Sequence, residues 1–252
     1  MILDPRRSVL LTDFDGTLAP IVDEPSAAVP LPGTTELLVG LADVFGRVAV
    51  VSGRPVSFLV DRLPGLVGSA VEVVGLYGLE MAGQDGEALP DPDVAPWRPV
   101  VRAAAERLAE RCPAGVLVEE KGATVTVHWR AAQQEQSWVT EAVAAEASRT
   151  GLAVHPARLS LELRPPLVID KGTVVYRRCT GMAGACYLGD DLGDLPAFDA
   201  LARWAADEDG VAIRVAVDGD DSAPDVVAEA DLVVAGPEAV LGLLDWLAAT
   251  AG

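Results

Sequence analysis

The sequence of 252 residues contains little cysteine and little histidine. Its three cysteines, Cys112, Cys179 and Cys186, form no CxxC pair, and an odd count disfavours a disulfide scaffold. We therefore expect a reduced, cytoplasmic protein. The only two histidines, His128 and His155, lie far apart in the chain. With so few thiol and imidazole groups, a tetrahedral zinc site is not expected.

Long apolar runs are also missing. No segment approaches the roughly 20 apolar residues that a membrane-spanning helix needs, and the N-terminal residues lack the layout of a signal peptide. Acidic residues outnumber basic residues by 38 to 19, so the formal net charge is -19. Such an acidic surface repels nucleic acid and anionic membranes. We expect a globular monomer with neither partner, in which an anionic small-molecule ligand would need a local cationic site.

Lysine is rare even among the basic residues. Only two of the 19 are lysine, Lys121 and Lys171, and the others are arginine. Because the chain prefers arginine wherever either cation serves, these lysines indicate places that need a compact ammonium group. The alternative is that two surface lysines arose by chance.

The order of predicted elements indicates an α/β fold with an insertion. Continuous apolar strands alternate with helices in the first and last thirds, which predicts a parallel sheet covered by helices on both faces. The middle third has alternating strands and helices with apolar faces of their own. We therefore expect a discontinuous core domain, residues 1–82 and 166–252, and an inserted α+β domain, residues 83–165.

Two aspartates follow the first apolar strand, predicted over Val9 to Asp15. Residues two apart on a strand point the same way, so we expect Asp13 and Asp15 to project together from one strand end. Like charges that close raise each other's pKa, so the pair suits a divalent cation or two distinct acid–base roles. The alternative is an Asx-rich turn after an ordinary strand.

Three further polar segments follow predicted strands or open helices. They are Ser52-Gly53-Arg54, Asp170-Lys171-Gly172 and the acidic run Gly189 to Asp194. Each alone could be a capping turn or a solvated helix end. Ligands of open α/β sheets bind at the carboxyl ends of the strands, so four such segments at one edge favour a ligand site.

The ordered motifs DxDGT, SGR, DKG and GDDxxD span the chain and resemble those of the haloacid dehalogenase (HAD) superfamily of phosphatases. This resemblance implies a Rossmann-like core, with its parallel sheet between helices, and an inserted cap domain. Further segments are similar to the trehalose-6-phosphate phosphatases, namely Gly75–Glu80, Glu119–Gly122, His128–Arg130 and Glu162–Pro165.

The resemblance also implies roles for the polar residues. Asp13 would attack phosphorus and form an aspartyl phosphate, while Asp15 would protonate the leaving alkoxide and later take a proton from water. Ser52 would donate to a phosphoryl oxygen, and Lys171 would neutralise developing charge. The implied cofactor is Mg²⁺, and the residues implied at the ion are Asp13, Asp15, Asp190, Asp191 and Asp194.

The implied substrate is a sugar phosphate, trehalose 6-phosphate. Glu119, Lys121 and Glu162 would hold glucose hydroxyls from the cap, and Arg54 and Arg130 are further expected substrate-binding residues. The alternative for the cap residues is a solvated hairpin face with a surface ion pair.

The chain departs from the family pattern at two places. Tyr77 stands where the family usually has histidine, and Leu195 follows Asp194 where the family usually has glutamate. These departures leave open a related glucosyl-like phosphate, such as glucosylglycerol phosphate or a pseudo-disaccharide phosphate. They also leave open a non-catalytic protein that binds sugar phosphates.

Overall fold

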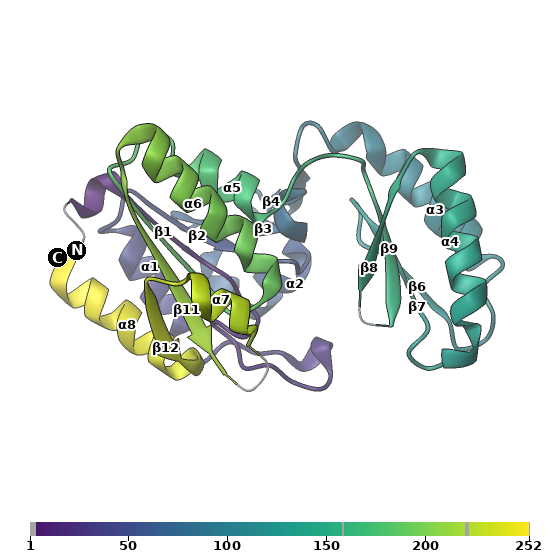
Figure 1. Cartoon of the computed structure of the whole chain (residues 1–252), viewed down its shortest axis with the longest axis horizontal. Coiled ribbons are helices and arrows are strands. Elements are labelled where there is room, and N and C mark those ends of the chain that lie inside the picture. Colours follow the sequence, from purple (N-terminus) through teal and green to yellow (C-terminus); the bar gives the residue numbers. More distant parts are fainter. Residues whose placement is uncertain (1–3, 158, 220–221, 252) are drawn as a thin grey trace. The chain divides into compact units, whose positions relative to one another are not determined.

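The chain forms two compact units in the computed structural model (Figure 1). The larger unit comprises Met1–Leu89 and Ile169–Gly252, and the smaller unit is Pro90–Val168. The residues that the structure describes are 4–157, 159–219 and 222–251.

The larger unit contains an eight-stranded sheet with the order β12-β11-β10-β1-β2-β3-β4-β5. Its strands are β1 (Ser8–Thr12), β2 (Arg47–Val51), β3 (Val71–Gly75), β4 (Glu80–Ala82), β5 (Ala88–Pro90), β10 (Gly184–Gly189), β11 (Val211–Asp218) and β12 (Leu232–Ala235). Neighbouring strands from β12 to β3 pair in parallel, and β4 pairs with β3 antiparallel. The predicted α/β class with a mainly parallel sheet is confirmed.

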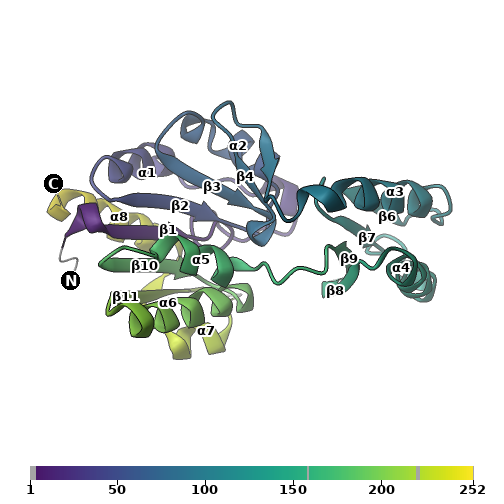
Figure 2. The same cartoon turned by 90° about the horizontal axis from the view of Figure 1, so that it is seen from above.

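Helices cover both faces of this sheet (Figure 2). One apolar core lies under α1 (Thr34–Ala42), α2 (Val56–Arg62) and α8 (Gly236–Ala251). The other lies under α5 (Lys171–Cys179), α6 (Leu195–Glu208) and α7 (Pro224–Glu229). Central strands supply both cores, since Leu10 faces the first and its neighbours Val9 and Leu11 face the second.

The shortest strands and helices were not predicted from the sequence. The strands β4 and β5 have three residues each and α7 has six, too few to give a periodic signal. The strand β5 belongs to the core sheet, and the smaller compact unit begins at its last residue, Pro90. Short 3-10 turns occur at Pro5–Arg7, Pro25–Ala27, Pro64–Leu66, Leu76–Gly78, Ala95–Trp97, Gln133–Glu135 and Leu192–Asp194.

The smaller unit has its own sheet and its own core. Its strands are β6 (Leu117–Glu120), β7 (Val125–His128), β8 (Ala153–Ala157) and β9 (Ser160–Arg164), in the antiparallel order β6-β7-β9-β8. Two helices, α3 (Arg98–Ala109) and α4 (Gln136–Thr150), share an apolar core with one face of this sheet. The other face carries a polar row in which Glu119, Thr126, Glu162 and His155 lie opposite one another on adjacent strands.

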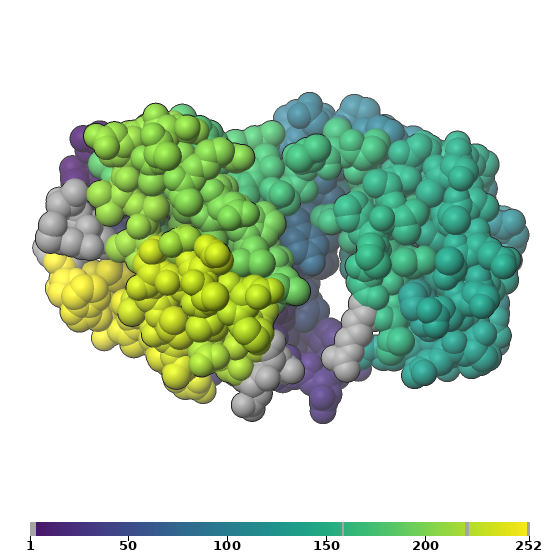
Figure 3. Space-filling view, in the orientation of Figure 1, coloured from purple at the N-terminus to yellow at the C-terminus, as the bar shows by residue number. Residues whose placement is uncertain are grey.

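The surface of the larger unit includes its C-terminal segment, coloured yellow in the space-filling view (Figure 3). This segment contains α8, in which Trp246 is 58% exposed while Leu244 is fully buried. Even so, among the described residues no helix combines the length and apolar character needed to cross a membrane.

A buried carboxylate joins the two helices of the smaller unit. Glu146 on α4 is 2% exposed, and it accepts hydrogen bonds from Arg107 Nη2 on α3 at 2.9 Å and from Arg149. Arg111 Nη2 lies 3.8 Å from the same carboxylate. Since a buried charge needs partners, this carboxylate ties α3 to α4.

We predict that Glu146→Ala lowers the free energy of unfolding by about 2 kcal/mol, because it removes charge-assisted hydrogen bonds but leaves only partly exposed arginines behind. Urea unfolding followed by tryptophan fluorescence measures the effect. The control is Glu141→Ala on the exposed side of α4, which should change stability by less than about 0.5 kcal/mol. Equal losses in the two variants would contradict the assigned role of Glu146.

Candidate functional site

Asp13 lies at the carboxyl end of the central strand β1. Its backbone N–H donates to Leu188 O at 2.9 Å, which extends the pairing of β1 with β10 by one residue. The residue is 4% exposed, and its Oδ2 lies 2.9 Å from Lys171 Nζ. Its Oδ1 is buried without a hydrogen-bond partner among the described residues. Burial raises the pKa of Asp13 well above its ordinary value.

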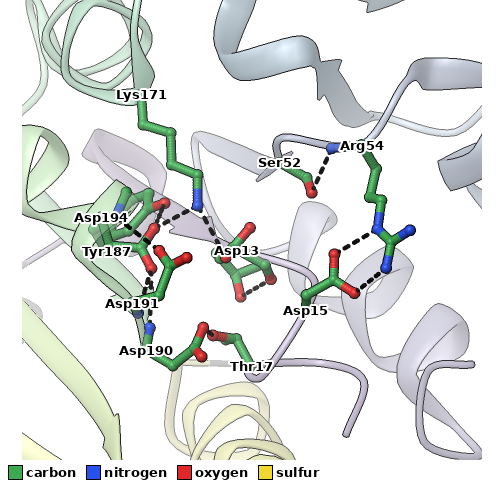
Figure 4. Close-up of polar contacts among 12 residues, drawn as sticks. Asp13, Asp15, Thr17, Ser52, Arg54, Lys171, Tyr187, Asp190, Asp191 and Asp194 are labelled. Carbon is green, nitrogen blue, oxygen red and sulfur yellow. Dashed lines mark hydrogen bonds and ion pairs between the residues drawn. The ribbon is translucent and has the colours of Figure 1, made fainter. Parts of the chain in front are cut away.

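Lys171 reaches from the first turn of α5 between two carboxylates (Figure 4). Its Nζ lies 2.6 Å from Asp194 Oδ1 in addition to its contact with Asp13. Asp170 caps the helix by accepting from the Thr173 N–H at 2.7 Å, which fixes the start of α5 at Lys171. Burial alone would lower the pKa of Lys171, but the carboxylates of Asp13 and Asp194 raise it well above its ordinary value.

Asp194 is fully buried, and its carboxylate accepts four hydrogen bonds from protein donors. Its Oδ1 accepts from Lys171 Nζ and from the Tyr187 hydroxyl, each at 2.6 Å. Its Oδ2 accepts from the backbone N–H of Asp190 at 2.9 Å and of Asp191 at 3.2 Å. A carboxylate offers about four acceptor sites, so Asp194 is saturated by protein donors. It therefore positions Lys171 and the acidic loop.

Asp190 packs against the turn that follows Asp13. Gly16 has φ +71, and a Cβ built on it would lie 2.0 Å from Asp190 Oδ2, so only glycine allows this approach. Burial, followed by the charges of Asp194 and Asp191, raises the pKa of Asp190 to about 7. Thr17 Oγ1 donates to Asp190 Oδ1 at 3.5 Å.

The buried carboxylates suit a divalent cation. Asp13, Asp190 and Asp194 each offer an oxygen, and these oxygens lie within 4.8 Å of one another. Three carboxylates around one ammonium leave negative charge uncompensated, and Asp13 Oδ1 is an unpartnered acceptor. Oxygen donors of this kind fit a hard cation such as Mg²⁺ or Ca²⁺. Because Asp194 is saturated, the acceptors left for an ion are those of Asp13 and Asp190.

Asp15 points to a different partner than Asp13 does. The strand expected to run to Asp15 ends at Thr12, and residues 16–18 form a turn between Asp15 and Ala19, which bridge to each other. The predicted extent of the strand is therefore wrong, although Asp13 and Asp15 still line one cleft. Arg54 holds Asp15 with two hydrogen bonds, Nε to Oδ2 at 2.7 Å and Nη2 to Oδ1 at 2.8 Å.

Ser52 follows β2 in a loop that is held in place by backbone hydrogen bonds to β3 and to the turn after it. The Ser52 N–H donates to Val74 O at 3.0 Å, and Ser52 O accepts from the Tyr77 N–H at 2.9 Å. Ser52 Oγ accepts from the Arg54 N–H at 3.2 Å, which leaves its own O–H able to donate elsewhere. Ser52 is 1% exposed, so its hydroxyl is fixed by packing and by this bond.

The backbone turns sharply after the third strand. The strand β3 ends at Gly75, and Leu76 and Tyr77 have φ of 50 and 61. Left-handed backbone costs of the order of 1–3 kcal/mol at a non-glycine residue. Glu80, 7% exposed, caps the neighbouring α2 by accepting from the Val56 N–H at 2.7 Å, and so helps to hold the turn.

One cleft of the larger unit, with a volume of about 320 Å³, gathers these side chains. Its lining residues are Asp13, Asp15, Ile21, Ser52, Gly53, Arg54, Tyr77, Lys171, Asp190 and Asp191. The four motifs singled out in the sequence therefore meet in one place. Asp194 lies behind the cleft, and Tyr187, which sequence reasoning missed, supports it. A tyrosine inside an otherwise apolar buried strand was the available signal.

The predicted residues of the smaller unit form their own cluster, with one exception. Lys121 Nζ lies 3.7 Å from Glu119 Oε2 and 3.8 Å from Glu162 Oε1. His128 Nε2 lies 3.0 Å from Glu119 Oε2, and this hydrogen bond is the main cause of the lowered pKa of Glu119. Arg130 is exposed beyond the end of β7, and none of the contacts described here joins it to this cluster.

The cluster also includes residues that sequence reasoning did not identify. Thr124 Oγ1 donates to Glu162 Oε1 at 2.8 Å, and Arg164 Nε lies 3.5 Å from Glu162 Oε2. Thr124 directly precedes β7 and Arg164 ends β9, and their alternation with apolar core residues was the signal that could have placed them on the polar face.

In comparison with known proteins, the chain is similar to trehalose-phosphatases. Residues 11–229 match the family model described as Trehalose-phosphatase. A trehalose-phosphate phosphatase of Mycolicibacterium paratuberculosis (strain ATCC BAA-968 / K-10) is 37% identical over an alignment of 225 residues that covers 85% of this chain and 56% of that protein. One from Mycobacterium leprae (strain TN) is 33% identical over 86% of this chain and 53% of its own length. The chain spans about half the length of these relatives.

Solved structures share the fold at lower identity. A trehalose-6-phosphate phosphatase related protein has a TM-score of 0.75 at 20% identity, covering 96% of this chain and 97% of that chain. The Aspergillus fumigatus trehalose-6-phosphate phosphatase has a TM-score of 0.66 at 23% identity, over 97% of this chain and 93% of that chain. The family model and the relatives together show that the chain belongs to the trehalose-phosphatase family.

Proposed function

We propose that this protein is a Mg²⁺-dependent phosphatase that hydrolyses trehalose 6-phosphate to trehalose and phosphate through an aspartyl-phosphate intermediate. Asp13 carries the proposal. Lys171 holds one oxygen of its buried carboxylate at 2.9 Å, while the other oxygen has no hydrogen-bond partner among the described residues. A carboxylate with only a structural role would have both oxygens satisfied, as Asp194 does.

The residues around Asp13 can stabilise the charge that develops on a phosphoryl group. Lys171 supplies a fixed ammonium at the nucleophile, and the Ser52 O–H can donate to a phosphoryl oxygen. Because Lys171 and Ser52 are each at most 2% exposed, their positions are set before substrate binds. Preorganised donors of this kind need no rearrangement during the reaction.

We propose that Mg²⁺ is held by Asp13, the backbone carbonyl of Asp15 and Asp190. When bound, the ion would offset the repulsion between the carboxylates and a phosphate dianion. Asp191 lines the cleft and would orient water, whereas Asp194 holds Lys171 and the acidic loop.

Asp15 is the proposed general acid and base. It protonates the leaving sugar oxygen and then accepts the proton of the water that hydrolyses the aspartyl phosphate. Arg54 orients this carboxylate with two hydrogen bonds and lines the same cleft, where its guanidinium can also bind substrate.

We propose that the smaller unit recognises the sugar. Glu119, Lys121 and Glu162 form a charged cluster on the polar face of its sheet, and charged groups make strong oriented hydrogen bonds to hydroxyls. Arg130 is proposed as a further substrate contact. The cytoplasmic location and the monomeric state stay predictions from the sequence.

We predict that the protein releases phosphate from trehalose 6-phosphate in the presence of Mg²⁺ and that Asp13→Asn lowers the rate at least about a thousandfold, because the amide cannot act as the nucleophile. Phosphate release over a panel of sugar phosphates measures this. The control is Asp199→Asn on the exposed side of α6, which should retain the rate.

The same panel separates the alternatives. Preferred turnover of glucosylglycerol phosphate or of a pseudo-disaccharide phosphate would replace the proposed substrate by a related one. Tight binding of a sugar phosphate without turnover of any would instead indicate a binding protein. Equal rates for the wild type and Asp13→Asn would remove Asp13 as nucleophile.

We predict that Gly16→Ala weakens Mg²⁺ binding about 10- to 100-fold, since its Cβ would displace the Asp190 carboxylate. Calorimetric titration with Mg²⁺ alone measures the affinity without relying on activity. Gly40→Ala is the matched control, because a Cβ at Gly40 meets nothing within 4 Å. Unchanged affinity in Gly16→Ala would argue against Asp190 as a ligand.

We predict that Glu162→Gln raises the KM for trehalose 6-phosphate about tenfold while changing the kcat/KM for acetyl phosphate little. The reason is that, of these two substrates, only trehalose 6-phosphate has a sugar that this carboxylate can bind. Glu120→Gln, on the opposite face of β6 and paired with Arg102 at 3.7 Å, is the control. Parallel losses for both substrates would indicate a structural role for Glu162.

A further inference from the structure

Tyr77 has an unusual backbone that its surroundings hold in place. It follows Leu76, and both residues are in the left-handed region, with φ of 61 and 50. The Leu76 N–H donates to Arg54 O and the Tyr77 N–H donates to Ser52 O, each at 2.9 Å. Non-glycine residues in this conformation persist where the surrounding structure fixes them, and they gather at functional sites. The turn is thus locked onto the loop that carries Ser52.

The phenol end of Tyr77 lies against Gly53 in the cleft. A Cβ built on Gly53 would be 2.5 Å from Tyr77 Cζ and 2.6 Å from the hydroxyl oxygen. Gly53 stands between Ser52 and Arg54, and all of these residues line the cleft with Asp13. The ring is therefore held beside the residues proposed to bind the phosphoryl group.

Packing of the core does not explain this ring. Leu76 is 1% exposed and fills the interior, whereas Tyr77 is only half-buried. The costly turn thus places one apolar side chain in the core and one aromatic side chain at the cleft. Lys171 and Ser52 already supply donors for a phosphate dianion, whereas the face and hydroxyl of the phenol suit the C–H groups and hydroxyls of a sugar.

We propose that Tyr77 contacts the sugar leaving group and discriminates sugar phosphates from small phosphate esters and anhydrides. This inference rests on the proposed phosphatase function and assigns part of its specificity. The aromatic face packs on the sugar ring, and the hydroxyl forms a hydrogen bond with one of the sugar hydroxyls.

The test compares kcat/KM for trehalose 6-phosphate with kcat/KM for acetyl phosphate, which lacks a sugar. Tyr77→Gly removes the ring and favours the left-handed backbone, so the variant keeps the turn. We expect the ratio of the two values to fall at least about tenfold in Tyr77→Gly. In Tyr77→Phe, which removes only the hydroxyl, it should fall about two- to tenfold. The control is Tyr176→Phe, which removes a hydroxyl that donates to Asp207 on the surface and should keep the wild-type ratio.

Gly53→Ala supplies an independent arm, because its Cβ would displace the phenol while leaving Tyr77 in the sequence. We expect Gly53→Ala to lower the ratio in the wild type and to lower it no further in Tyr77→Gly. A wild-type ratio in Tyr77→Gly, or equal proportional losses for both substrates, would overturn the role of Tyr77. Absence of phosphate release from every sugar phosphate by the wild type would instead reject the proposed function itself.

Discussion

The burial of one ammonium group between two carboxylates organises the site. Lys171 Nζ lies 2.9 Å from Asp13 and 2.6 Å from Asp194, and it comes from a helix that begins beside both. Buried charges are tolerated only when paired, so neither carboxylate can move without leaving the other charges uncompensated. This requirement fixes the end of β1, the start of α5 and the loop after β10 relative to one another.

Asp194 extends this constraint from the lysine to the acidic loop. Four donors hold it, and two of them are the backbone N–H groups of Asp190 and Asp191. The same carboxylate thus sets both the position of the ammonium and the backbone of the residue proposed to bind the cation. Asp13 is left with one oxygen that has no protein donor among the described residues, which is the condition a nucleophile needs.

Much of this arrangement followed from sequence order, because polar residues after parallel strands must meet at one edge of the sheet. What failed was local geometry. The alternation of side chains along β1 was extended to Asp15, but β1 ends at Thr12, and Asp15 lines the same cleft as Asp13 from the following loop, where Arg54 holds its carboxylate. The turn at Leu76 and Tyr77 escaped prediction because neither residue favours left-handed backbone, so tertiary hydrogen bonds impose it. Arg130 is exposed beyond the end of β7, and its role as a substrate contact stays a prediction.

The discontinuous larger unit has a consequence for how the protein is made. β1 lies in the middle of the sheet, between β2 and β10, and Val9 pairs with Ala185. Contacts so distant in sequence form slowly, and a chain emerging from the ribosome carries β1 with one edge unpaired until β10 has been synthesised. Lys171, Asp190 and Asp194 emerge in the same late stretch. Nascent chains therefore hold Asp13 without its partners, and the cluster proposed to react is complete only when the segment that carries Lys171, Asp190 and Asp194 docks.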